Sequence, residues 1–317
     1  MAQAAQPLGR AAAIAAMPQL ALAVVLGRGS EGPPLCRVAV DADGDVMDLK
    51  DEIEREAGVP SAEQRLYTGG RLMRDVDDLI AFSLDGEEAL VELVRLDRQK
   101  AETLRRLENG EMSLGELDEA SREDRDFVLA ALWRAGAMTS DVRRAEAIAQ
   151  VGEALWADRE VVLAAVTCDG GALGRAAAPI HGDRAVVLAA VAQDGQALTH
   201  ASDALRRDRE VVLTAVRRNG FVLELLPEEL RGDRQVVLTA LHRTGAALQF
   251  VAEPLRQDWD VIATAVRTDP DAIDHAPGDL RGDHDFQRFM KDYFVKDRRY
   301  SPEAQAEEGL RMEGMWG

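Results

Sequence analysis

Cysteine, long apolar runs and aromatic side chains are scarce in this sequence, and each shortage excludes a class of protein. The two cysteines, Cys36 and Cys168, are far apart, so neither a disulfide framework nor a CxxC zinc site can form. This usage predicts a reducing compartment, cytoplasmic or nuclear. No 18 consecutive residues are apolar, which predicts no membrane span. Hydrophobic residues make up 46% of the chain and aromatic residues only 4%, which favours close packing of helices over a β-sandwich.

Positive charge is also scarce. The formal net charge is -19, and only four of the 38 basic residues are lysines. A surface this acidic repels phosphate groups, so we expect neither nucleic acid nor anionic membranes as partners. The sequence contains no P-loop, no GxGxxG and no HExxH motif, and its five histidines do not cluster. We therefore expect no enzyme, no cofactor and no metal site.

The strongest pattern in the sequence is a repeat. The stretch Asp-Arg-x-Val-Val-Leu-x-Ala-Val recurs at intervals of 25 residues, with its Asp at positions 158, 183, 208, 233 and, in degenerate form, 258 and 283. Each Asp can cap a helix, and the apolar residues after it follow helical spacing. A glycine twelve residues later, as at Gly170, is expected to end the helix in the left-handed conformation. A second short helix follows, so the sequence predicts helix–turn–helix units that stack as an α-solenoid.

The chain outside the regular repeats can also be divided into segments. We predict a disordered tail over residues 1–17, for which a targeting peptide is the alternative, a helical repeat domain over 97–300 and a flexible tail over 301–317. The unit that begins at Asp124 is 34 residues long, so it carries an insertion over 137–145 that we expect as a loop or an extra helical turn. Insertions in repeat proteins are frequent binding sites, although a tolerated surface loop is the alternative. Residues 97–123 are predicted as a divergent first unit and 283–300 as a terminal cap.

Arginine recurs directly after the capping Asp of the repeats. Stacking the units would align these side chains along one edge, where they could bind carboxylates or phosphates of a partner. The alternative is that they form salt bridges with the Asp and Glu of the next unit. The residues in question are Arg159, Arg184, Arg209 and Arg234.

The N-terminal region has a different pattern, with β-strands expected over 20–26, 35–40, 64–68 and 89–96 and a helix from Val46 to Ala57. Within it, residues 45–84 resemble ubiquitin. The resemblance rests on Leu49, Ile53, the Gly58-Val59-Pro60 helix exit and Gln64-Arg65-Leu66. It implies a ubiquitin-like domain of the β-grasp fold over residues 18–96. The whole chain is then α+β, with this domain followed by the all-α solenoid of 25-residue helix–turn–helix repeats.

The resemblance also implies a binding surface. Domains of this kind bind ubiquitin-receptor or proteasome-type proteins through an exposed apolar patch on the third strand. Here that patch would consist of Arg65, Tyr67, Gly69 and Arg71, although Tyr67 could equally be an ordinary surface residue. No free Gly-Gly ends the domain, and its only lysine, Lys50, lies where the family has a structural lysine, so conjugation is not supported.

The repeats resemble the family called domain of unknown function 4116, through the Asp-Arg-Glu-Val-Val-Leu stretches at 158–163 and 208–213 and the Gly-x-x-Leu step after each. The resemblance covers roughly residues 120–283 and implies no activity. Together the two halves predict a non-enzymatic adaptor, whose repeats bind a protein and whose ubiquitin-like domain docks on ubiquitin or proteasome machinery. The alternative is a structural scaffold in which the ubiquitin-like domain only caps the repeat stack.

Overall fold

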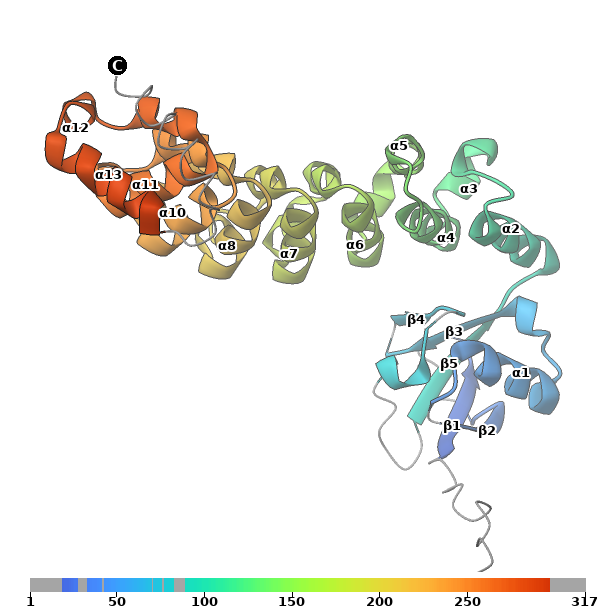
Figure 1. Ribbon diagram of the computed structural model, residues 1–317. Coiled ribbons are helices and arrows are strands. Elements are labelled where there is room, and N and C mark those ends of the chain that lie inside the picture. Colours follow the sequence, from blue (N-terminus) through green and yellow to red (C-terminus); the bar gives the residue numbers. More distant parts are fainter. Residues whose placement is uncertain are drawn as a thin grey trace, which may run out of the picture. The chain divides into compact units, whose positions relative to one another are not determined.

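The computed structural model describes residues 19–27, 33–41, 43–69, 71–75, 77–82 and 89–296. Both predicted tails, 1–17 and 301–317, lie outside these residues. The chain is α+β and divides into two compact units, one reaching to Arg106 and one beginning at Leu107 (Figure 1).

The first unit contains a mixed sheet of five strands, in the order β2-β1-β5-β3-β4. The parallel pair is β1 with β5, and the antiparallel pairs are β1 with β2, β3 with β4 and β3 with β5. The sequence predicts four of these strands at nearly their observed positions and misses the short β4. The strands are β1 (Gln19–Leu26), β2 (Cys36–Asp41), β3 (Gln64–Thr68), β4 (Arg71–Met73) and β5 (Ala89–Arg95).

One α-helix, α1 (Val46–Ala57), covers one face of this sheet and has the predicted bounds. Its start is a capping box, in which Asp48 N donates to Asp45 Oδ1 at 2.9 Å and Asp45 N donates to Asp48 Oδ2 at 3.1 Å. Gly58 ends the helix in the left-handed conformation, with φ 68°. Leu49 and Ile53 of α1 are fully buried against the apolar face of the sheet. Two 3₁₀ turns, η1 (Ser61–Glu63) and η2 (Leu79–Phe82), complete the described part of the unit.

The second unit is a helical repeat region. Within the predicted insertion 137–145, residues 137–140 are not helical and residues 141–145 form the first half of α5. The elements before the regular repeats are α2 (Arg98–Asn109), which begins in the first unit, η3 (Leu114–Glu116), α3 (Glu119–Arg122), α4 (Arg125–Gly136), α5 (Asp141–Ala149) and η4 (Glu153–Ala157).

Each regular repeat begins with a helix capped by the repeated Asp. In the unit at Asp208, its Oδ1 accepts hydrogen bonds from Glu210 N at 3.0 Å and Val211 N at 3.1 Å. Valine and alanine fill the buried face of each helix, and neighbouring helices pack in chain order (Figure 1). These helices are α6 (Arg159–Cys168), α7 (Arg184–Gln193), α8 (Arg209–Arg218), α10 (Arg234–Leu241) and α11 (Trp259–Thr268).

The second half of each unit differs from the predicted single short helix. It consists of a six-residue 3₁₀ segment and then another single turn, separated by extended residues. The first set is η5 (Gly170–Arg175), η7 (Gly195–His200), η9 (Gly220–Leu225), η10 (Gly245–Phe250) and η12 (Pro270–His275). The second set is η6 (Ala178–Gly182), η8 (Leu205–Arg207), α9 (Glu228–Arg231), η11 (Leu255–Gln257) and α12 (Gly278–Arg281).

The extended residues join neighbouring units through the backbone. Ala177 N donates to Trp156 O at 2.8 Å, Ser202 N to His181 O at 2.9 Å and Ala252 N to Arg231 O at 3.1 Å. Each of these bonds reaches the second turn of the preceding unit. A continuous helix through these residues would direct its amides to its own carbonyls and lose the connection.

The repeated glycine does not end the helix in the left-handed conformation, so this prediction is wrong. An extended residue before it, such as Asp169 with φ -150°, ends the helix and caps the 3₁₀ segment. The glycine is needed for close approach instead. A Cβ on Gly195 would lie 2.5 Å from the carbonyl oxygen of Ala215, in the helix of the next unit. Side chains are excluded there because the two backbones touch.

The last described helix, α13 (His284–Lys296), closes the repeats and departs from their pattern. Asp283 caps it in the usual way, accepting from Phe286 N at 3.0 Å. Phe286 and Met290 are fully buried, and the Trp259 ring lies 5.7 Å from the Phe286 ring and 5.4 Å from that of Phe289. Phe286 and Met290 stand where the other repeats have valine and alanine, and Trp259 stands where the earlier units have arginine.

Candidate functional site

The repeat-edge arginines are engaged within the repeats. Arg159 Nε lies 2.5 Å from Asp183 Oδ2, and Arg209 Nη1 lies 2.5 Å from Asp233 Oδ2. Arg184 bonds to both Asp208 and Glu210, and Arg234 lies 3.4 Å from Asp260. Each arginine therefore connects its own unit to the capping residues of the next one. The inter-unit salt bridges that the sequence offers as the alternative are present at these four residues, and a strip that binds a partner's acidic groups stays a prediction.

These ion pairs lower the pKa values of the capping aspartates. The Arg159 guanidinium holds the pKa of Asp183 below its usual range, and Arg209 does the same to the pKa of Asp233. Backbone amides at the helix start act in the same direction, since they also favour the charged carboxylate. Each capping Asp thus serves two purposes, because it closes its own helix and receives the arginine of the preceding unit.

The predicted patch on β3 is not exposed in the structure. Tyr67 is 1% exposed and Arg65 is 5% exposed, so Tyr67 cannot act as a surface anchor in this conformation. Neighbours flank β3 on both sides, with Tyr67 opposite Leu72 of β4 and Glu92 of β5, and Leu72 is itself 3% exposed. The alternation of a strand predicts one solvent face, and it fails here because both faces of β3 are buried.

The other two residues of that prediction lie at the turn after β3. Gly69 is exposed with φ 55°, a conformation that favours glycine. Arg71 is exposed, and its guanidinium lies 4.8 Å from the centre of the Phe82 ring while Nη1 donates to Ala81 O at 3.4 Å. Arg71 therefore holds η2 in place. The buried Lys50 has a structural partner too, since its Nζ lies 2.6 Å from Asp75 Oδ1.

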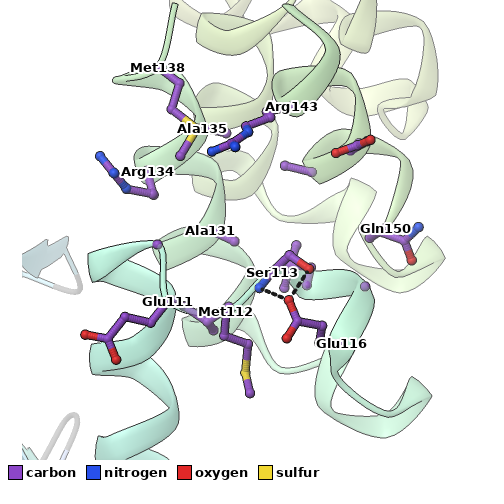
Figure 2. Close-up of a pocket in the computed structure, with 16 residues that line it drawn as sticks. Glu111, Met112, Ser113, Glu116, Ala131, Arg134, Ala135, Met138, Arg143 and Gln150 are labelled. Atoms are coloured by element: carbon purple, nitrogen blue, oxygen red, sulfur yellow. Dashed lines mark hydrogen bonds between the residues drawn. The ribbon is translucent and has the colours of Figure 1, made fainter. Parts of the chain in front are cut away.

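The second unit has a groove of about 510 Å³ at the inserted helix α5. Small side chains on α4, Ala131 and Ala135, leave the space open, and Arg143 and Ala147 of α5 form one wall. Figure 2 shows the groove with Met138, Arg134 and Arg143 on one side of the opening and Met112, Ser113 and Glu116 on the other. We call this opening the α5 groove, and the remaining lining residues are Leu107, Gly110, Glu111, Leu114, Gly115, Glu146 and Gln150.

Local hydrogen bonds fix the lower wall of the α5 groove. Gly110 turns the chain at the end of α2 with φ 75°, and Arg134 lies so close that a Cβ on Gly110 would be 2.9 Å from its Nε. Glu116 Oε1 accepts from Ser113 N and from Ser113 Oγ, both at 2.9 Å, which forms a capping box for η3. These bonds hold η3, and the long side chains of Arg134 on α4 and Arg143 on α5 also line the groove.

Two arginines in the α5 groove have no hydrogen-bond or ion-pair partner among the described residues. They are Arg134, whose Nε is buried without a partner, and Arg143. The repeat-edge arginines are all paired, so these two differ from them. Arg143 falls in the insertion that the sequence indicates as a candidate site. Arg134 and the methionines give no signal in the sequence, because they occupy ordinary positions of an irregular unit.

No three His, Cys, Asp or Glu side chains among the described residues are grouped so as to hold a metal ion. Burial raises the pKa of the Cys168 thiol to about 11, and its Sγ lies 3.2 Å from Leu132 O, so this thiol is protonated and enclosed at neutral pH. Within the described part of the chain, no helix is both long and apolar enough to cross a membrane.

A known family matches part of the repeat region. Residues 183–231 and 233–281 match the family model described as a domain of unknown function (DUF4116). Residues 183–281 are tandem DUF4116 repeats. Each DUF4116 match holds two of the 25-residue units and begins at a capping Asp, Asp183 or Asp233. The units at Asp124 and Asp158 and the α5 groove lie outside the matched residues. No curated protein and no solved structure matches the chain.

Proposed function

We propose that this chain is a non-enzymatic adaptor, in which an α-solenoid binds a protein partner and a ubiquitin-like β-grasp domain docks on ubiquitin or proteasome-type machinery. The observation that carries the proposal is the α5 groove. Repeat proteins bind partners on the surfaces that their stacked units expose, and insertions between units modify those surfaces. Here the inserted helix builds a wall of the groove and brings an unpaired arginine into it.

The chemistry of the α5 groove suits a peptide segment. Alanine and methionine side chains provide an apolar floor, and methionine adapts to different side chains. Arg134 and Arg143 can pair with carboxylates of the segment, because guanidinium groups bind carboxylates through two hydrogen bonds. A volume of about 510 Å³ accommodates a few side chains and is too small for a folded domain.

Blocking the α5 groove should abolish partner binding. Ala147 is half-buried and lines the groove, whereas Ala145 lies on the same helix, is exposed and does not line it. We expect full-length Ala147→Arg to lose the proteins that the unmodified chain recovers from an extract of the source cells, and Ala145→Arg to recover them fully. Both changes carry the same charge and a small helix-propensity cost. Equal recovery by the two variants would show that the groove is not the binding surface.

The N-terminal unit supports the second half of the proposal. Its five-stranded mixed sheet with one helix on one face is compatible with a β-grasp. With Tyr67 buried, the large apolar side chains exposed on the described strands are Leu26 of β1, which is 56% exposed, and Leu90 of β5, which is 48% exposed. Thr68 Oγ1 donates to Leu90 O at 3.3 Å, which places Leu90 beside the Gly69 turn. We propose that Leu90 and this turn form the docking surface.

A ubiquitin-binding helical peptide, fluorescently labelled, tests this docking surface. We expect Leu90→Gln in the full chain to weaken its binding about tenfold, because the variant loses the burial of one leucine at the interface. Met47→Gln is the matched control, since Met47 is 38% exposed on α1. Fluorescence anisotropy measures both affinities. If the peptide fails to bind the unmodified chain, the ubiquitin-type role is wrong, while the α5 groove is unaffected.

A further inference from the structure

The 3₁₀ segments of consecutive units form a second face of the repeat region, because η7, η9, η10 and η12 pack against one another. Their first, third and fourth residues are mostly buried, and their second and sixth residues are mostly not. In η9 these outer positions hold Phe221 and Leu225, which are 42% and 43% exposed. The sixth position of η10 is Phe250, whose ring lies edge-on at 6.3 Å from that of Phe221. We call these three residues the Phe221 patch.

The Phe221 patch is an exception among the units. The corresponding positions of η7 hold Gln196 and His200, and those of η12 hold Asp271 and His275. Exposed aromatic and leucine side chains gathered at one place on a surface are typical of interaction sites. Because the corresponding positions of η7 and η12 are filled without phenylalanine, packing within the units does not explain the two phenylalanines.

Beside the Phe221 patch lies a pocket of about 310 Å³ between η7 and η9. Its lining residues include Phe221, Leu225, His200, Asp194 and Glu224. Asp194 Oδ1 caps η7 by accepting from Gln196 N at 3.0 Å. Glu224 is exposed and has no hydrogen-bond or ion-pair partner among the described residues.

Positive charge is missing from the four segments around the Phe221 patch. The segments 195–200, 220–225, 245–250 and 270–275 contain neither lysine nor arginine, and their carboxylates are Glu224, Asp271 and Asp274. The nearest arginines along the chain are occupied, since Arg218 Nη2 donates to Gln193 O at 2.9 Å and Arg243 Nε donates to Arg218 O at 3.4 Å. Both reach back to the C-terminal end of the preceding helix, where cations are stabilised. The face is therefore apolar and acidic at the same place.

We propose that the Phe221 patch and its pocket bind a segment of a partner protein that carries a lysine or arginine next to a large apolar residue. The aliphatic stem of the basic residue would lie along Phe221, with its charge between Glu224 and Asp194. The apolar neighbour would cover Leu225 and Phe250. Anionic ligands are disfavoured here, because the site has no positive charge to receive them. This surface shares no residue with the α5 groove, so it does not depend on the function proposed there.

Three designed peptides test binding to the Phe221 patch. One is an 18-residue amphipathic helix with leucine on one face and arginine along its border; the second has each arginine replaced by glutamate, and the third has each leucine replaced by serine. We expect the first to bind the full chain, measured by fluorescence anisotropy, and the other two to bind at least about tenfold more weakly. Equal binding of the arginine and glutamate peptides would overturn the proposal.

Two variants locate the binding. Phe221→Ala removes an exposed ring, and Glu224→Lys reverses the charge at the pocket; each should weaken the arginine peptide about tenfold. Glu228→Lys is the matched control, because Glu228 is exposed and does not line the pocket. It should change the affinity by less than about twofold. If Glu228→Lys weakens binding as much as Glu224→Lys, the attraction reflects only the net charge of -19, and the proposed site is wrong.

The patch could instead be covered by a second copy of the chain. Sedimentation velocity of the unmodified chain and of Phe221→Ala distinguishes the two occupants, and we expect a monomer in both cases. A dimer that Phe221→Ala converts to a monomer would overturn the proposal in favour of self-association. Far-UV circular dichroism should give the same spectrum for all variants, because each replaced side chain is exposed.

Discussion

Replacing Gly220 with alanine is expected to destabilise the helical repeat region by about 3 kcal/mol, the upper end of the usual cost of overpacking. Gly220 begins η9, and a Cβ at this position would lie 2.6 Å from Ala240 O and 2.8 Å from Thr244 Cβ. The first of these atoms belongs to the backbone of α10, so no rotation of a side chain can relieve the contact. The helix of the next unit has to move instead.

Gly182→Ala is the control for this measurement. No atom lies within 4 Å of a Cβ placed on Gly182, and its φ is not positive. Alanine there should stabilise the protein slightly, by roughly 0.5 kcal/mol, because the unfolded chain loses conformational freedom. Urea unfolding followed by circular dichroism gives both values. If the two variants unfold at the same urea concentration, the close approach at Gly220 is not a constraint on the fold.

The glycines show where sequence reasoning stops. A period of 25 residues, an Asp that caps and an apolar stripe are properties of one unit, so the sequence predicts the helices and their starts. The reason for the glycine lies in the next unit, because Ala240 O belongs to the neighbouring helix. A single unit read alone suggests a helix stop. The same limit explains the second half of each unit, where amides such as Ala177 N bond to the preceding unit.

The N-terminal unit gives a similar comparison. Four of the five strands, α1 and its end at Gly58 follow from local patterns, whereas the short β4 and the capping box of Asp45 and Asp48 were not predicted. The burial of Tyr67 was not predicted either, because a strand with alternating side chains does not reveal whether its outer face is covered. Only the pairing of Tyr67 with Leu72 identifies a second apolar row on that face.

The sequence indicates some of the candidate binding residues and not others, for the same reason. Arg143 lies in an insertion that breaks the period, and such breaks are visible in a sequence. Phe221 and Phe250 also depart from the repeat, yet they are 29 residues apart and meet only because successive 3₁₀ segments pack together. The distinction between the paired Arg209 and the unpaired Arg134 depends on where carboxylates lie in neighbouring elements.

Replacing the capping Asp233 with alanine should cost about 2 kcal/mol of the free energy of unfolding, since it removes a helix cap and one ion pair together. Asp233 Oδ1 accepts from Gln235 N at 2.9 Å and Val236 N at 3.1 Å, and Oδ2 lies 2.5 Å from Arg209 Nη1. Asp233→Asn keeps an oxygen for the cap and loses the charge, so we expect about half the effect. Asp279→Asn is the control, because Asp279 is exposed and has no hydrogen bond or ion pair among the described residues.

The pH dependence of stability distinguishes the contribution of the Asp233 charge from that of its helix cap. The Arg209 guanidinium holds the pKa of Asp233 below its usual range, so the ionised carboxylate stabilises the folded state above the unfolded pKa of about 3.9. This contribution disappears as the pH falls through the lower folded pKa, where the unmodified side chain becomes neutral like asparagine. Urea unfolding at pH 7 and near pH 2 should therefore show a gap between Asp233→Asn and the unmodified chain that closes in acid. A gap that stays constant would mean that the pairing of Arg209 with Asp233 does not stabilise the junction between these two units.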